Sequence, residues 1–415
     1  MRLLHTSDWH VGKAIRGRSR AQEHQAVLAE VAGIADREAV DLVIVAGDVF
    51  DTSTPTAESE RIVYRALLDL AAGGRPVIVV AGNHDSAPRL QAVAPLSEAS
   101  GIRVASAISP ADDGGVVELA VGGEVAQVAL LPFPSQRYVV TADLLLSGDA
   151  ADAHAAYADR VVRIVRTLTN RFRADTVNLV VAHLMVMGGA MGGGERGAHT
   201  VFDYWVPATA FPPAAQYVAL GHLHRAQQLA GPAPLHYCGS PLQLDFGETA
   251  NDPVVNVVDV RPGAPARVRP VALTAGRRLR TLRGALADVI ARATDVGTVS
   301  DDHVRIVLDE PGRAGLADEV RAQVPNAVEV ALAPRAETGD AARSPAPNQD
   351  RLRRSPHDLL AEYLAEHDAH DERVVALFDE LVDESLDESV NESVSDAAGQ
   401  PVGGAAGGEH VGVGR

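Results

Sequence analysis

The sequence predicts an α/β fold in which helices enclose mixed β-sheets, and three observations lead to this prediction. Short continuous apolar segments rich in valine and isoleucine recur through residues 1–260, as is typical of strands buried on both faces. Segments with helical periodicity separate several of these strands. Several strands near the end of the region follow one another without a helix between them, which indicates mixed sheets. We therefore expect a layered α/β sandwich.

The elements of this first region can be placed in chain order. Two helices are expected between the early strands, at Ala21–Glu38 and Ala57–Ala72. The expected strands are Leu3–His5, Asp41–Ala46, Pro76–Ala81, Val125–Leu131, Val177–Ala182, Tyr217–Leu220 and Val254–Val260.

Residues 276–335 predict a second, smaller unit in which strands and helices alternate. This is a small α+β pattern, so we expect one domain at 1–275 and another at 276–335. The elements expected in the smaller domain are strand Leu279–Leu282, helix Ala285–Ala293, strand Val304–Leu308, helix Gly315–Val324 and strand Val328–Leu332.

The remainder of the chain contains three segments that differ in composition. Residues 336–355 are rich in alanine, proline and charge, a composition that predicts a linker. Residues 356–385 resume helical periodicity and predict two amphipathic helices, which would pack either on a partner or on the protein's own body. Residues 386–415 are acidic and then glycine-rich, so we expect them to be disordered.

Composition limits the function classes that fit. The 415 residues carry a formal net charge of −18, which argues against a generally basic nucleic-acid binder. Residues 356–415 alone contribute −13, however, so residues 1–355 carry only −5 and leave room for a local basic patch. No long apolar run or signal-peptide pattern is present, and Cys238 is the only cysteine. We expect a cytoplasmic protein without a membrane segment or internal disulfide.

Candidate metal ligands follow five of the predicted strands. Polar residues at the ends of strands are where α/β folds gather their ligand sites. The Asp-Trp-His and His-Leu-His segments each place two ligands two residues apart, so an extended backbone points both the same way. The candidate ligands, in chain order, are Asp8, His10, Asp48, Asn83, His183, His222 and His224.

Three of these segments carry a glycine at the strand end, at positions 47, 82 and 221. We expect Gly47, Gly82 and Gly221 to let the backbone turn sharply there. The ligand set mixes carboxylate, imidazole and amide, which suits Mn²⁺, Fe or Zn²⁺ better than Ca²⁺. Seven ligands are too many for one tetrahedral ion, whereas two ions bridged by a carboxylate such as Asp48, roughly 3.5–4 Å apart, would use them all.

His84 differs from its neighbours because it follows the amide ligand Asn83 and would project towards the substrate. A histidine in that place can protonate the leaving oxygen or stabilise the transition state. We expect Asp85 to orient it, as carboxylates orient imidazoles elsewhere. The predicted site therefore holds catalytic His84 and Asp85 beside the metal ligands.

These motifs resemble those of the calcineurin-like metallophosphoesterase superfamily: D-x-H, GD-x-x-D, GNH-D, a lone histidine and GH-x-H, all present without substitution. The resemblance is dense over residues 1–250 and looser beyond. It is closest to the DNA nuclease subunits of the superfamily, over the segments Leu4–Gly12, Ala46–Ser53, Ala81–Ser86, Ala219–Ala226 and Tyr237–Pro241.

The resemblance implies a four-layer αββα sandwich with a small α+β capping domain and C-terminal helices. It also implies a Mn²⁺-dependent nuclease, a 3′–5′ double-strand exonuclease and single-strand or hairpin endonuclease of DNA repair, recombination and replication. The implied partners are DNA, a second copy of the chain and a coiled-coil ATPase that the C-terminal helices contact. By the same resemblance, one metal would be held by Asp8, His10, Asp48 and His224, and the other by Asp48, Asn83, His183 and His222.

Basic residues follow the first ligand pair and could bind backbone phosphates, at Lys13, Arg16, Arg18 and Arg20. The alternative is a solvated charged loop. The glycine-rich segment Gly188–Gly194 predicts a mobile loop beside the site.

Other candidates are weaker. His5 lies inside the first strand and is expected to be structural, whereas His199 and His236 fit either a structural or a functional role. Tyr204 and Trp205 fit either the core or an interface.

Two further functions remain open beside the DNA nuclease. One is a phosphodiesterase of small molecules or cyclic nucleotides from the same superfamily, and the other is a non-catalytic DNA-binding scaffold. The small domain and the C-terminal helices favour the nuclease over the first alternative. The complete ligand set and His84 argue against the second.

Overall fold

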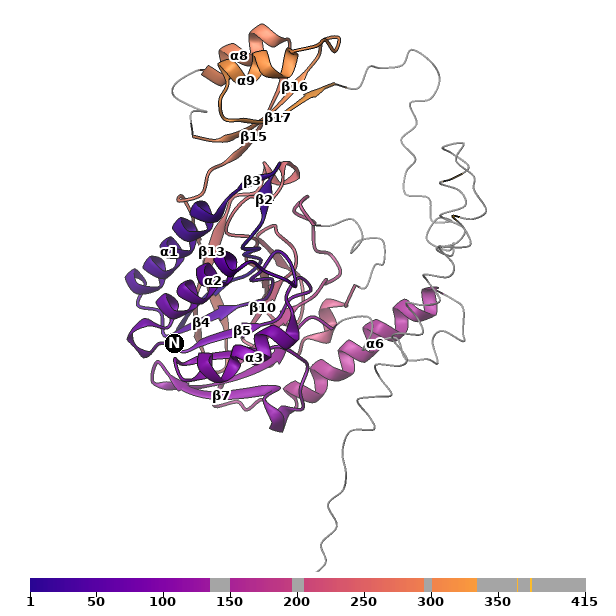
Figure 1. Ribbon diagram of the computed structural model, residues 1–415. Helices are drawn as coiled ribbons and strands as arrows, with labels where there is room; N and C mark the ends of the chain where they lie inside the picture. Colours follow the sequence, from indigo (N-terminus) through magenta and orange to yellow (C-terminus); the bar gives the residue numbers. More distant parts are fainter. Residues whose placement is uncertain (135–149, 196–204, 295–300, 334–363, 365–373, 375–415) are drawn as a thin grey trace, which may run out of the picture. The chain divides into compact units, whose positions relative to one another are not determined.

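A computed structural model describes residues 1–134, 150–195, 205–294, 301–333, 364 and 374 (Figure 1). The chain divides into a unit of Met1–Leu146 with Ala151–Thr338 and a second of Ser147–Ala150 with Gly339–Arg415. Apart from single positions, the predicted linker, helical segment and tail lie outside the described residues and stay predictions. None of the helices in the described ranges is long and apolar enough to cross a membrane.

The first of two six-stranded sheets contains the N-terminal strand at its centre. The four strands that come first along the chain are parallel to one another. Each of the last two runs antiparallel to the strands beside it. The strand order is β14 (Ala264–Ala272), β13 (Val254–Arg261), β1 (Arg2–Thr6), β4 (Leu42–Val45), β5 (Val77–Val80) and β6 (Ile102–Ala105).

The second sheet is also mixed, with four parallel strands at its centre and an antiparallel strand at each edge. Its order is β11 (Gln227–Leu229), β12 (Leu235–Tyr237), β10 (Tyr217–Gly221), β9 (Val177–His183), β8 (Glu124–Leu131) and β7 (Val116–Val121).

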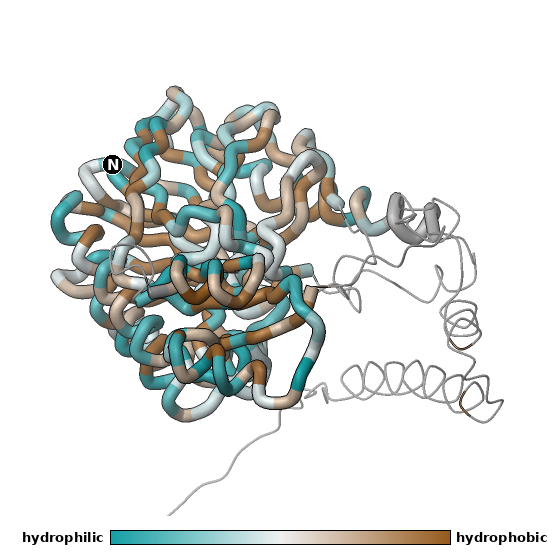
Figure 2. Tube along the Cα trace, turned by 90° about the horizontal axis from the view of Figure 1, so that it is seen from above, coloured by the Kyte–Doolittle hydropathy of each residue, from teal (hydrophilic) through white to brown (hydrophobic). Residues whose placement is uncertain are grey.

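The two sheets pack face to face, and the alternation of their side chains explains why the strands are apolar throughout. In β4, Leu42 and Ile44 point into the core between the sheets, whereas Val43 and Val45 point to the outer face. In β9, Val181 faces the other sheet and Val180 faces outward. Both faces of each sheet are therefore buried. In Figure 2, many of the brown, hydrophobic stretches of the chain lie in the interior of the domain.

Helices cover the outer face of each sheet. Helices α1 (Ala21–Arg37) and α2 (Ala57–Leu70) lie side by side on the first sheet (Figure 1). Helix α6 (Ala150–Thr169) covers the second sheet and packs Val161 and Val165 against it. The order of layers is helix, sheet, sheet, helix, so the expected four-layer αββα sandwich is confirmed.

Local capping explains where two helices begin. The Thr56 side chain accepts a hydrogen bond from Ser59 N at the start of α2, and Glu58 and Glu60 lie in its first turn. Helix α3 (Ala87–Glu98) begins in the same way, with the Ser86 side chain as its cap.

The smaller region is a separate three-stranded parallel sheet, in the order β15-β16-β17, with its own core. Parallel neighbours need a crossover, and the two helices provide it. Its elements agree with those expected to within a few residues: β15 (Leu279–Gly284), α8 (Leu286–Thr294), β16 (His303–Leu308), α9 (Leu316–Gln323) and β17 (Ala327–Leu332).

Candidate metal centre

Neighbouring strands bring the seven candidate ligands to one place. Strands β1, β4 and β5 are adjacent in the first sheet, and β9 and β10 are adjacent in the second. Each ends beside the others, and the loops that follow are joined by backbone hydrogen bonds from Asp8 N to Gly47 O (2.9 Å) and from His10 N to Asp48 O (3.0 Å). The ends of these strands therefore hold the candidate ligands close together.

Three groups of possible ligand atoms result, and two of them consist only of candidate ligands. The third joins His10 and Asp48 with His84. Asp8, His10 and His224 each offer an atom within 4.8 Å of the others, and we call this group half-site A. Asp48, His183 and His222 do the same and form half-site B.

Residues beside the two half-sites join them. The Asp48 carboxylate reaches both, since it lies 3.5 Å from His10 Nε2 and 3.3 Å from His183 Nε2. Asn83 belongs with half-site B, because its Oδ1 lies 2.7 Å from His222 Nδ1 and 3.1 Å from His183 Nε2.

Four of these residues adopt a backbone conformation that side chains other than glycine rarely take. The φ angles are +53° at Asp8, +45° at His10, +51° at Asp48 and +102° at His222. Such conformations cost of order 1–3 kcal/mol each and persist where the surrounding structure enforces them. Their concentration at the ends of adjacent strands marks this edge as a functional site.

The strand-end glycines serve two different purposes. Gly47 has a φ of +91°, so the expected sharp turn is present there. Gly82 and Gly221 are needed for close approach, which corrects the expectation of a sharp turn. A Cβ atom at Gly82 would lie 2.1 Å from Asp48 Oδ1, and one at Gly221 would lie 1.8 Å from Ala46 O.

The donor set fits a divalent metal pair. His10 has both ring nitrogens buried without a hydrogen bond in the part of the chain that the structure describes. Such a residue is costly unless an atom outside the chain binds it. His183 is bonded through Nδ1 to Ala46 O (2.8 Å), so its Nε2 faces the cluster. His224 is bonded through Nδ1 to Glu248 Oε1 (2.7 Å), and its Nε2 is left for half-site A.

Carboxylates beside two of the candidate histidine ligands favour their charged form. Burial opposes the charged form of His183, but the Asp48 carboxylate beside it raises the pKa of that imidazole to about 9. Burial likewise opposes charge on His224, and the hydrogen bond with Glu248 raises its pKa to about 9. Divalent cations would replace these protons, because a histidine must be neutral to ligate.

His84 lies where expected, but a different residue holds it. Its Nδ1 lies 2.7 Å from the backbone oxygen of Asp51, and its ring packs edge-on against His10. Asp85 instead accepts hydrogen bonds from the backbone N–H groups of Val49, Phe50 and Gly82. The expected orienting role of Asp85 is therefore wrong, and the carboxylate organises the loops around the site.

The four basic residues separate into different environments. Lys13 lines the pocket of the candidate ligands, with its Nζ 3.5 Å from Asp51 Oδ1. Arg16 pairs with Glu329 of the small domain at 2.6 Å, and Arg18 donates to Ala327 O at 3.2 Å. Arg20 is only 1% exposed and bonds Glu23 and the Gln243 carbonyl, so burial excludes the expected contact with DNA phosphates.

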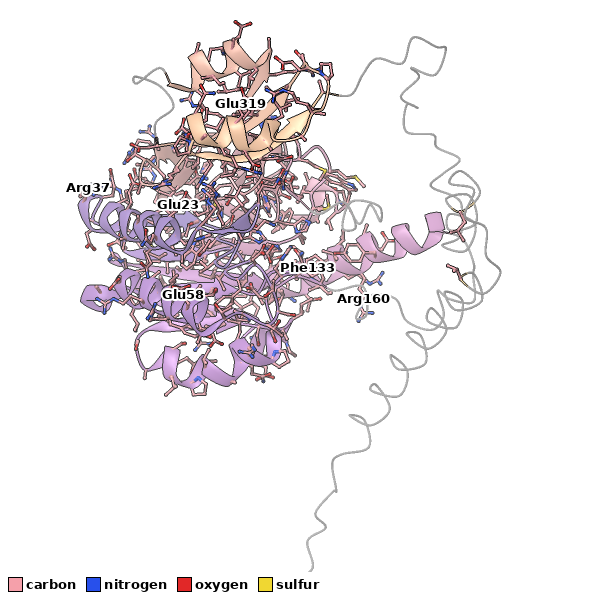
Figure 3. All side chains as sticks on the ribbon, turned by 45° about the horizontal axis from the view of Figure 1, so that its top comes forward. Glu23, Arg37, Glu58, Phe133, Arg160 and Glu319 are labelled. Carbon is pink, nitrogen blue, oxygen red and sulfur yellow. The ribbon has the colours of Figure 1, made fainter. Side chains whose placement is uncertain are left out.

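Several residues of the site were not expected from the sequence. Asp51 contacts His10 and Lys13, Glu248 contacts His224, and Glu195 accepts from His224 N at 3.0 Å. Phe133, labelled in Figure 3, stacks on His222 with ring centres 5.9 Å apart. The GD-x-x-D motif contains Asp51 and was the one available signal.

The glycine-rich segment lies beside the site, packed against it. A Cβ at Gly192 would lie 2.9 Å from His224 Cβ, and one at Gly194 would lie 1.9 Å from Glu248 Oε1. Both backbone groups of Ala190 bond the Gln227 side chain. The mobility expected of this loop stays a prediction.

The weaker candidates are structural where they are described. His5 is buried, and its Nδ1 lies 2.8 Å from Tyr217 Oη. His236 stacks on the same tyrosine, and Trp205 packs against the outer core of the second sheet. His199 and Tyr204 lie outside the described residues.

Comparisons with known proteins agree with this site. The sequence model of the family described as Calcineurin-like phosphoesterase matches residues 1–226, which include all seven candidate ligands. The chain is 38% identical over 283 residues to the SbcD subunit of the SbcCD nuclease from Bacillus subtilis (strain 168), covering 67% of this chain and 71% of the relative. Identity to the SbcD subunit of Rhodobacter capsulatus is 36% over 283 residues, covering 65% and 69% of the two chains. For the SbcD subunit of Escherichia coli (strain K12), identity is 32% over 306 residues, covering 73% and 76%.

Proposed function

This chain belongs to the calcineurin-like phosphoesterase family, as a metal-dependent phosphoesterase of the SbcD nuclease group, and from this premise we propose that it is a Mn²⁺-dependent DNA nuclease. Its proposed activities are 3′–5′ exonuclease action on double-stranded ends and endonuclease action on single strands and hairpins. It would act in DNA repair and recombination with an SbcC-type coiled-coil ATPase, as a homodimer within a heterotetramer.

The observation that carries the proposal is a pair of half-sites joined by one carboxylate, with His84 beside them. Asp8, His10 and His224 would hold one ion, and Asn83, His183 and His222 would hold the other, with Asp48 between them. Two divalent ions so held supply Lewis-acid stabilisation of the phosphoryl group and an activated water.

Two residues of the chain, His84 and Asp85, are assigned roles beside the metal ligands. The Asp51 carbonyl oxygen lies 2.7 Å from His84 Nδ1 and holds this ring beside His10. We assign His84 the donation of a proton to the leaving oxygen, a role that typically contributes about 10²–10⁴-fold in rate. Asp85 fixes the loops from which Asp48 and His84 project, and is a positioning residue here.

The surroundings of the pocket support a polymeric substrate over a cyclic nucleotide. A second cavity of about 280 Å³ lies next to the metal pocket, and Lys13 lines both. Its wall carries the hydroxyl groups of Thr52, Thr54 and Ser59, beside the acidic residues Asp51 and Glu58. A strand that extends from the metal pocket would meet an ammonium group and neutral donors there, which suits a sugar-phosphate backbone.

The proposal is tested with the purified full-length chain, Mn²⁺ and linear double-stranded DNA. Wild-type protein should shorten the duplex, and chelation of the metal should stop the reaction. His84→Ala should lower the rate by about 10²–10⁴-fold, because the proton donor is lost. Metal analysis of the same variant should still find two ions per chain, since His84 is assigned no ligand role.

A small-molecule assay separates the alternatives. A wild-type chain that hydrolyses a cyclic nucleotide, yet leaves every DNA substrate intact in the presence of its ATPase partner, would replace the nuclease by the phosphodiesterase. A chain that binds DNA but hydrolyses no phosphodiester at all would favour the scaffold.

A further inference from the structure

We propose that Glu248 is a positioning residue for His224 and that it makes half-site A bind a divalent cation more tightly than half-site B. The inference rests on the proposed two-metal site. It does not depend on whether DNA is the substrate. It adds an unequal order of metal binding, set by carboxylates that the ligand motifs do not include.

The imidazole of His224 is held by a buried charge. Glu248 is 1% exposed, and its Oε1 lies 2.7 Å from His224 Nδ1. A carboxylate in this place fixes the tautomer and the ring orientation, and it makes the other ring nitrogen a stronger donor to a metal. His224 Nε2 is therefore prepared for half-site A before any ion binds.

The Glu248 carboxylate is itself fixed by its surroundings. Its second oxygen accepts a hydrogen bond from Leu244 N at 2.7 Å, and its backbone oxygen accepts one from the Gln243 side chain at 3.2 Å. Gly194 lies so close that an added Cβ would be 1.9 Å from Oε1. These contacts hold the carboxylate against the His224 ring.

A second carboxylate holds the backbone of the same ligand. Glu195 Oε1 accepts hydrogen bonds from His224 N at 3.0 Å and from Gly192 N at 2.6 Å, and Oε2 accepts one from Gly193 N at 2.7 Å. The glycine-rich loop, His224 and Glu248 thus form one packed unit. Gly194 of this loop lies against the Glu248 carboxylate, which is buried.

The ligands of half-site B have different support. His183 Nδ1 bonds the neutral carbonyl of Ala46 at 2.8 Å, whereas the His222 ring stacks on Phe133 and its backbone N–H donates to Asp8 Oδ1 at 2.9 Å. Half-site B contains the neutral amide Asn83, whereas half-site A contains the carboxylate of Asp8. Asp48 contributes to both half-sites and does not distinguish them. Glu248 and Glu195 therefore add two carboxylates beside the half-site A ligand His224, and we expect a divalent cation to bind there first.

Calorimetric titration of the metal-free, full-length chain with MnCl₂ tests this proposal. Wild-type protein should bind two ions in two separable steps. Glu248→Gln keeps an oxygen that can accept from His224 Nδ1 but removes the charge, so the tighter step should weaken by about 10- to 100-fold. The weaker step should change little.

A second variant guards against the chance that a buried substitution disturbs folding. Gly194→Ala leaves Glu248 chemically intact but places a methyl group where Oε1 now lies, so it should weaken the same step. Glu98→Gln, at an exposed carboxylate on α3, is the matched control and should titrate like the wild type. Thermal melting of each metal-free variant reports whether it is folded.

The outcomes are distinct. Folded Glu248→Gln and Gly194→Ala proteins that keep the tighter step unchanged would overturn the proposal, as would a loss confined to the weaker step. A wild-type chain that binds fewer than two ions would instead contradict the proposed two-metal site.

Discussion

Asp51 shows how one residue can support several parts of a site without being a ligand. Its Oδ1 lies 3.5 Å from both His10 Nδ1 and Lys13 Nζ, and its backbone oxygen meets His84 Nδ1 at 2.7 Å. Burial alone would raise the pKa of its carboxyl, but His10 and Lys13 lower it below its usual value. A charged Asp51 therefore positions a metal ligand, a cation and the proposed proton donor together.

Lys13 is the basic residue best placed to contact a DNA phosphate. Lys13→Ala should weaken duplex binding and reduce the slope of log affinity against log salt by about 1, because one fewer counterion is released. Fluorescence anisotropy across a series of salt concentrations measures both quantities. Arg65→Ala, an exposed arginine on α2 that pairs with Asp69, is the control. An unchanged slope for Lys13→Ala would remove this lysine from the interface.

At the scale of the elements, the strand-end glycines are as necessary as the ligands that follow them. Gly82→Ala would push a methyl group to 2.1 Å from Asp48 Oδ1 and 2.4 Å from its backbone nitrogen. Since Asp48 reaches both half-sites, Mn²⁺ affinity should fall by about 10- to 100-fold. Metal titration of the variant tests this prediction.

The control for that substitution is a glycine inside a helix. Gly33 lies in α1, where a Cβ would meet only the far end of Arg37 at 3.2 Å. Gly33→Ala should raise the free energy of unfolding by about 0.5–1 kcal/mol and leave metal binding unchanged. Equal metal affinities for Gly82→Ala and Gly33→Ala would show that the strand end tolerates a side chain.

Strands buried on both faces were predictable from sequence, because a short, continuous apolar run such as Leu42–Val45 is typical of them. The exposed edge strand β14 was missed, since it alternates charged, small and proline residues. The ligands were predictable for a related reason: each lies at the end of one of the buried strands or within a few residues after it. Glu195 and Glu248 were not, because only tertiary folding brings their loops to His224.

Glu23, labelled in Figure 3, connects helix α1 to the small domain. Its carboxylate accepts from Arg20 Nη2 and lies beside His303 Nε2, each at 2.7 Å, and it also accepts from Arg277 N. Burial would raise the pKa of Glu23, but His303 and Arg20 lower it to about 2. The charged form therefore stabilises the fold at pH values above about 4.5, and this contribution is lost as the pH falls towards about 2.

Glu23→Gln should accordingly lower the free energy of unfolding by about 1.5–3 kcal/mol at pH 7, the usual range for a hydrogen bond to a charged group. The difference from wild type should shrink below pH 4.5. Urea denaturation at a series of pH values provides the measurement. A difference that stays constant down to pH 3 would mean that the carboxylate charge is not what stabilises this contact.

For the molecule as a whole, negative charge is very unevenly distributed. Residues 356–415 carry −13 of the total of −18, so the larger part of the chain, which holds the site, is only mildly acidic. Residues 1–355, with a net charge of only −5, therefore repel a polyanionic substrate less than the total charge of the chain suggests. This distribution separates the proposed DNA-binding region from the proposed partner-binding segment along the sequence.

Deletion of residues 356–415 should abolish co-purification with a co-expressed SbcC-type ATPase, since the amphipathic pattern at 356–385 is the proposed contact with the partner. A shorter deletion of residues 386–415 removes the acidic, glycine-rich tail but keeps that pattern, and it should co-purify normally. Both truncated chains should retain Mn²⁺-dependent phosphoesterase activity, because all seven candidate ligands precede residue 225. If the longer deletion still co-purifies, the partner must contact residues 1–355. If both deletions fail, the tail itself carries the interaction.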